Sequence, residues 1–126
     1  MVDENGFGAA VQLDHERLDA YRVAVALDAA VVAVARRAPR GHAWLGDQAQ
    51  RASASVVLNL AEAMGREGAD RARTLRIARG SALEVDAALT LLSQRGGCSP
   101  SARAEARSLN LRVVAMLTKL RQRAAG

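Results

Sequence analysis

The 126-residue chain lacks several features that would point to particular classes of protein. Only 2% of its residues are aromatic, and it has two prolines and ten glycines. Collagen-like chains and most turn-rich β architectures are therefore excluded, because they use far more proline and glycine. Cys98 is the only cysteine, so no disulfide can form within the chain and a disulfide-built secreted domain is also excluded.

Long apolar runs are absent as well. The longest, from Ala29 to Ala35, is far shorter than the roughly 20 residues that a membrane-spanning helix needs. The first residues, Met1-Val2-Asp3-Glu4-Asn5, are acidic and have no apolar core, unlike a secretory signal peptide. We therefore expect a cytoplasmic protein that has no membrane partner.

What the chain does have is a large share of Ala, Leu and Val, within an apolar fraction of 50%. Ala favours helix more than any other residue. A quarter of the residues are charged, which still leaves enough apolar area for a packed core. We predict an all-α protein with a flexible lead-in over residues 1–12 and a single domain over residues 13–124.

Apolar residues spaced alternately by three and four predict four helices. The predicted starts are Asp14, Asp47 (with Gln50 completing a capping box), Asp70, and Ser99 followed by Pro100. The core stripes of the four helices are predicted to be Ala20, Ala24, Leu27, Val31 and Val34; Leu45, Ala49, Ala52, Val56, Leu60 and Ala63; Leu75, Ala78, Ala82, Val85, Leu89 and Leu92; and Ala102, Ala106, Leu109, Val113, Met116 and Leu120. Short loops between such helices favour an antiparallel up-and-down four-helix bundle.

The first and fourth helices carry more apolar residues than one bundle core needs. The second stripes are Leu18, Tyr21, Val25 and Val32 on the first helix, and Leu111, Val114 and Leu117 on the fourth. We interpret this surplus as a homo-oligomer interface, while the alternative is ordinary surface leucine and valine. Gly80 lies within the third helix, where glycine costs about 1 kcal/mol relative to alanine. We interpret it as a point where another backbone approaches closely.

The charge is strongly basic and unevenly distributed. Eighteen Lys and Arg against thirteen Asp and Glu give a net charge of +5, and Lys119 is the only lysine. Residues 99–126 hold most of the surplus, whereas residues 1–20 are acidic. A basic surplus fits a nucleic-acid partner, although the codon bias of a GC-rich genome would also enrich arginine. The candidate nucleic-acid-binding residues are Arg66, Arg71, Arg73, Arg76, Arg112, Lys119 and Arg123.

Two motifs lie on the second and third predicted helices. They are Gln48-x-x-Arg51-Ala52-x-x-Ser55-x-x-x-Asn59-Leu60-Ala61-Glu62 and Ile77-Ala78-Arg79-Gly80-Ser81-x-x-Glu84. Together they resemble the bacterial four-helix-bundle proteins encoded in intervening sequences of 23S rRNA genes, and they are similar to the accessory protein of diversity-generating retroelements. The resemblance covers about residues 13 to 122. This chain departs from the family pattern at Val57, where proline is usual, and at Ala63, where glycine is usual.

The resemblance implies a ring-like homo-oligomer, most often a pentamer, with a basic surface that binds RNA or DNA. It also implies, for the retroelement members, a reverse transcriptase as protein partner, and no catalytic activity. This makes the chain a candidate accessory to a larger nucleoprotein. The alternative is a protein-interaction or scaffold oligomer whose charge serves solubility and contacts between subunits.

The polar motif residues favour a structural role. Asn59 and Glu62 are three residues apart and share a helix face, as do Ser81 and Glu84. A carboxylate beside an apolar stripe needs partners, because its desolvation is costly. We predict a network that fixes the helix register and consists of Arg51, Asn59, Glu62, Arg79, Ser81 and Glu84. Direct contact with a ligand is the alternative.

Catalytic and metal sites are not expected. Di-iron bundles use Glu-x-x-His, yet neither His15 nor His42 follows a glutamate by three residues. An all-carboxylate site from Asp28, Glu62 and Glu84 is the remaining metal arrangement. No histidine lies on a predicted helix beside a Ser or Cys nucleophile. We expect a protein without a metal, a cofactor or an enzymatic activity.

Overall fold

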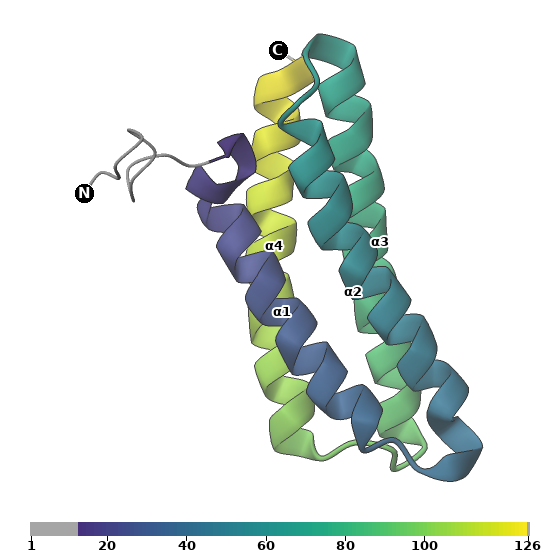
Figure 1. Ribbon diagram of the computed structural model, residues 1–126. Coiled ribbons are helices and arrows are strands. Elements are labelled where there is room, and N and C mark those ends of the chain that lie inside the picture. Colours follow the sequence, from purple (N-terminus) through teal and green to yellow (C-terminus); the bar gives the residue numbers. More distant parts are fainter. Residues whose placement is uncertain (1–12, 126) are drawn as a thin grey trace, which may run out of the picture.

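The computed structural model describes residues 13–125, which form four α-helices and two short 3-10 turns (Figure 1). In chain order the elements are η1 (Asp14–Arg17), α1 (Asp19–Arg36), η2 (Arg40–His42), α2 (Ala43–Ala63), α3 (Gly68–Gln94) and α4 (Pro100–Ala125). Residues 13–125 contain no strand. The predicted all-α class and the four helices are confirmed, and the predicted lead-in over residues 1–12 lies outside the described residues.

The helices form an up-and-down bundle. Each packs against its neighbours in the sequence, and α4 packs back against α1. The α1–α2 and α3–α4 connections lie at one end of the bundle, and the α2–α3 turn lies at the other end beside the C-terminus of α4 (Figure 1). A core of small apolar side chains fills the space between the helices.

The predicted core stripes of α1, α2 and α3 are confirmed, because every residue in them is buried. The stripe of α4 is correct only for Ala106 and Val113. The buried line of this helix continues through Asn110 and Leu117, whereas Met116 and Leu120 are only partly buried. Leu117 is therefore a core residue with 0% exposure, and its assignment to an oligomer surface is wrong.

Three of the predicted helix starts need correction. Asp14 begins only the turn η1, because Leu18 is extended and separates this turn from α1. The second helix begins at Ala43, before Asp47, because η2 runs directly into it and Leu45 is already buried in the core. The third begins at Gly68, two residues before Asp70.

The fourth helix begins as predicted. Pro100 is its first residue, and the Ser99 hydroxyl accepts a hydrogen bond from the backbone N–H of Ala102 at 3.2 Å. A serine hydroxyl in this position satisfies one of the N–H groups that a helix start leaves unpaired.

The prediction that another backbone of the same chain approaches Gly80 closely is wrong. A Cβ added at Gly80 would meet nothing within 4 Å, because this residue faces outward. The tight contact is at Gly46 of α2, where an added Cβ would lie 3.2 Å from the Cα of Ala35 on α1. Only glycine allows α1 and α2 to approach this closely.

Candidate nucleic-acid interface

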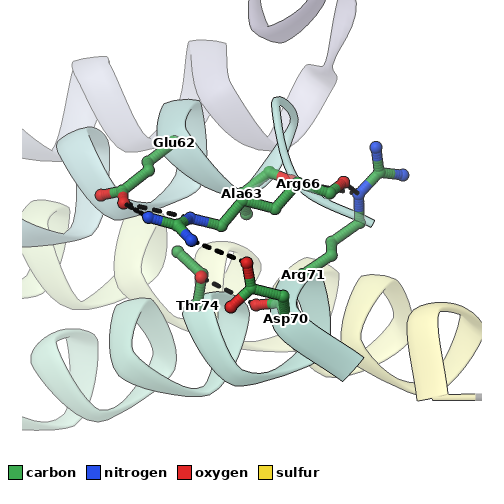
Figure 2. A network of polar contacts seen from close by, with 6 residues as sticks. All are labelled: Glu62, Ala63, Arg66, Asp70, Arg71 and Thr74. Carbon is green, nitrogen blue, oxygen red and sulfur yellow. Dashed lines mark hydrogen bonds and ion pairs between the residues drawn. The ribbon is translucent and has the colours of Figure 1, made fainter. Parts of the chain in front are cut away.

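The α2–α3 turn holds Arg66 between two carboxylates (Figure 2). Its Nη1 lies 2.7 Å from Oδ2 of Asp70, and its Nε donates to Oε2 of Glu62 at 3.1 Å. The hydrogen bonds that Arg66 donates to Glu62 and to Asp70 raise its pKa above that of an ordinary arginine. Arg66 therefore stays charged, but two acidic neighbours oppose its attraction for a phosphate.

Arg71 closes the C-terminal end of α2 (Figure 2). Its Nε donates to the backbone carbonyls of Ala63 at 3.0 Å and Arg66 at 2.7 Å, and its Nη2 donates to that of Met64 at 3.3 Å. The last carbonyls of a helix lack partners within the helix, and a basic side chain can satisfy them. The Arg71 side chain thus stabilises the α2–α3 turn.

Arg73 and Arg76 lie on the outer surface of α3, and we call these two residues the α3 ridge. Both are exposed, and neither forms an ion pair or a side-chain hydrogen bond with any residue between 13 and 125. They are three residues apart and so lie on adjacent turns of one helix surface. Their guanidinium groups can therefore donate to an external acceptor.

The second predicted basic strip, on α4, faces a different side of the bundle. Arg112, Lys119 and Arg123 are all exposed. Lys119 and Arg123 line a depression with Leu18 and Asp19, which belong to the α1 side. Other residues of α4 face α3: Thr118 accepts a hydrogen bond from Arg79, and Arg107 donates one to Asp86. At its C-terminal end this strip meets the α2–α3 turn, because Arg123 lines a second depression together with Arg71.

The predicted polar network separates into independent contacts. Ser55 of α2 and Ser81 of α3 share a hydrogen bond of 2.8 Å, and the Asn59 amide donates to the Ser55 hydroxyl at 3.0 Å. These three side chains connect α2 to α3. Ser55 belongs to the first motif, although the predicted network does not include it.

The charged members of that network lie elsewhere. Arg79 donates to the Thr118 hydroxyl of α4 at 2.9 Å, whereas Glu62 pairs with Arg66. Arg51 and Glu84 are exposed and form no ion pair among the described residues. The carboxylates are at the surface, so they need no buried arginine, and the expected pairing with Arg51 and Arg79 is wrong.

Comparison with known families identifies the chain. Residues 16–119 match the family described as 23S rRNA-intervening sequence protein. The chain belongs to this family. The match includes both motifs, and therefore the Ser55–Asn59–Ser81 contacts that join α2 to α3. A search of the curated proteins found no match.

The carboxylates considered for a metal site lie on different elements of the bundle in this family member. Asp28 accepts a hydrogen bond from Ser53 at 2.7 Å between α1 and α2, Glu62 is at the α2–α3 turn, and Glu84 is on α3. Residues 13–125 contain no group of three or more His, Cys, Asp or Glu side chains that could hold a metal ion. No described helix is both long and apolar enough to cross a membrane.

Sequence reasoning misses a second group of exposed arginines. No site predicted from the sequence includes Arg36, Arg37, Arg40 or Arg95. All four are exposed and lie at the end of the bundle that carries the α1–α2 and α3–α4 connections. The available signal is the run Arg36-Arg37-x-x-Arg40, close to the only tryptophan and with no acidic residue between them.

Proposed function

We propose that this member of the 23S rRNA-intervening sequence protein family is a non-enzymatic oligomer that binds the phosphate backbone of RNA or DNA. The α3 ridge is the observation that carries this proposal. Arg73 and Arg76 are exposed and unpaired among the described residues, whereas nearby Arg66 and Arg71 are held by protein groups. Unpaired guanidinium groups donate strong hydrogen bonds to phosphate oxygens.

The family description, which names 23S rRNA, favours RNA over DNA as the partner. A contact through phosphates alone would position the protein without reading sequence. The α4 strip of Arg112, Lys119 and Arg123 adds positive charge on another side of the bundle. Because Arg123 and Arg71 line one depression, the strip can contact the same polyanion at the end of the bundle that carries the α2–α3 turn.

Oligomer formation is supported by an apolar patch on the seam between α3 and α4. Leu83 and Leu111 line one depression there, and their side chains are 49% and 58% exposed. Burying such a patch against a second copy removes apolar surface from water. In a ring, most simply the pentamer implied by the resemblance, every subunit would present the same α3 ridge.

A double substitution tests the proposed function. Replacing Arg73 and Arg76 by Gln removes the unpaired guanidinium groups from an exposed surface and leaves the core untouched. We expect weaker binding of a short RNA duplex, and a salt dependence whose slope falls by up to about 0.9 for each phosphate that the variant no longer neutralises. Fluorescence anisotropy over a series of salt concentrations measures both quantities.

The matched control is Arg22→Gln, which is compared with the single variant Arg73→Gln. The charge change is the same, but Arg22 of α1 is already paired with Asp19 and does not line the Leu83–Leu111 depression. We expect a smaller effect on binding from this variant. A parent protein that binds no nucleic acid at low salt would favour the scaffold alternative, for which the Leu83–Leu111 patch is the supporting observation. Equal losses in Arg22→Gln and Arg73→Gln would show that binding follows net charge and not the α3 ridge.

A further inference from the structure

We infer that the end of the bundle formed by the α1–α2 and α3–α4 connections binds an unpaired nucleotide, whose base stacks on Trp44. The inference rests on the proposed nucleic-acid binding and adds to it a second contact, with a different chemistry, at the end opposite the α2–α3 turn. Its ligand is a single-stranded or looped segment of RNA or DNA.

Trp44 is the only tryptophan in the chain and lies at the second position of α2. Its side chain is 53% exposed, which is unusual for a large apolar ring in a small bundle. The guanidinium carbon of Arg95, which follows α3, lies 5.4 Å from the ring centroid. This is a cation–π arrangement. One guanidinium covers one face of an indole, so ring area remains on which a base can stack.

The chain around Trp44 is basic. Residues 36–46 contain three arginines and no Asp or Glu, and residues 87–104 contain two arginines and no acidic residue, while Asp47, Asp86 and Glu105 directly adjoin these ranges. Of these five, Arg103 is held by Asp86 and Thr90. The other four are exposed and form no ion pair with a described residue: Arg36, Arg37, Arg40 and Arg95.

These arginines come from two connections that meet at one end of the bundle (Figure 1). Arg40 begins η2, which runs directly into α2, so it precedes Trp44 by only four residues in the chain. Arg37 lines a depression together with Glu105 and with Gly96 and Gly97, which directly follow Arg95. The positive charge is therefore shared between both connections, at the end of the bundle where Arg95 lies over the exposed ring.

An exposed aromatic ring among unpaired arginines matches the chemistry of an unpaired nucleotide. Bases stack on aromatic side chains regardless of their identity, while arginines hold the phosphates on either side. A duplex hides the faces of its bases in the helical stack, so it cannot use Trp44 in this way. A single aromatic residue of this kind binds a base without reading the sequence of the strand.

Intrinsic fluorescence is a direct test, because emission from the sole tryptophan reports on Trp44 alone. The full chain is titrated at low salt with oligouridine, with oligodeoxyuridine and with a blunt RNA duplex. We expect quenching by single strands, and little change when the duplex binds. Quenching by oligouridine alone would assign the site to RNA, and quenching by both single strands would assign it to either nucleic acid. Both results support the inference.

Variants separate stacking from folding and from general charge. We expect Trp44→Ala to weaken oligouridine binding by about tenfold, within the range measured for loss of one aromatic stacking partner. Trp44→Phe keeps a smaller ring and should lose less affinity. Leu58→Ala is the matched control, because Leu58 is another exposed apolar side chain of α2, 67% exposed, and belongs to no arginine cluster. Binding is followed through a labelled oligonucleotide, and folding by circular dichroism.

Two results would overturn the inference and are distinguishable from each other. If single strands bind without changing the emission, and Trp44→Ala binds as tightly as the parent, the base does not stack on Trp44, while backbone binding through α3 stands. If neither single strands nor duplex bind at low salt, the inference and the proposed function are both wrong.

Discussion

Two glycines inside helices have opposite surroundings, although the sequence presents them alike. Gly46 faces the backbone of Ala35, whereas Gly80 faces outward, with nothing within 4 Å of the position that a Cβ would take. The cost of glycine in a helix depends on local conformation and can be predicted from sequence. Its packing depends on where the neighbouring helix lies, and no local pattern contains that information. For this reason the sequence indicates a close approach at Gly80 and none at Gly46.

Substitutions at these glycines should have opposite effects on stability. We expect Gly46→Val to lower the free energy of unfolding by about 1–3 kcal/mol, because the added side chain meets the α1 backbone. Gly80→Ala should raise it by up to about 1 kcal/mol through helix propensity alone. Urea denaturation followed by circular dichroism measures both changes. A destabilised Gly80→Ala protein would contradict the open surroundings of this residue.

At the scale of the helices, the periodic patterns predict the buried faces of α1, α2 and α3 but not the full face of α4. Asn110 explains the difference. It is 4% exposed and donates to the backbone carbonyl of Ala82 on α3 at 2.8 Å. A polar residue interrupts the apolar pattern, so the sequence favours a line through Met116 and Leu120 instead. The hydrogen bond that allows Asn110 to be buried comes from another helix.

The α2–α3 turn should depend on Arg71 far more than on Arg73. Arg71→Met keeps an aliphatic stem but removes the donors to three carbonyls. We expect the free energy of unfolding to fall by about 1.5 kcal/mol, the lower end of the range for hydrogen bonds to charged groups. Arg73→Met, the matched control on the exposed face, should leave thermal stability unchanged. Equal melting temperatures for the two variants would show that the turn does not need the arginine.

At the scale of the whole molecule, the sequence predicts which residues are basic but not which of them are available for binding. Ion pairing of Arg66 and capping by Arg71 depend on the geometry of a turn. Likewise, the side of α4 that faces α1 and the side that faces α3 can be told apart only when the positions of both helices are known. The α3 ridge and the arginines around Trp44 are therefore structural results, although every residue in them is visible in the sequence.

Assembly is the remaining test at this scale. We expect the parent chain to have several times its own mass of 13.3 kDa in solution. Replacing both Leu83 and Leu111 by Ser should shift it to the monomer, because these substitutions remove the exposed apolar patch on the α3–α4 seam. Multi-angle light scattering gives the mass directly. A monomeric parent at micromolar concentration would exclude the oligomer. If the Leu83 and Leu111 variant stays oligomeric, and a variant with Leu58→Ser and Ile77→Ser dissociates, the subunit interface lies on α2 and α3.

The closure of α4 onto α1 also has a consequence for the order of folding. The other three helix seams join elements that are consecutive in the chain, whereas this one brings together its first and last helices. The entropy cost of closing a loop increases with its length, so the three local pairings can form at lower entropic cost than the α1–α4 seam. That seam would then form late in folding and open early in unfolding. Interactions formed after the transition state mainly control the rate of unfolding, so the packing of α1 on α4 would set how long the native bundle persists.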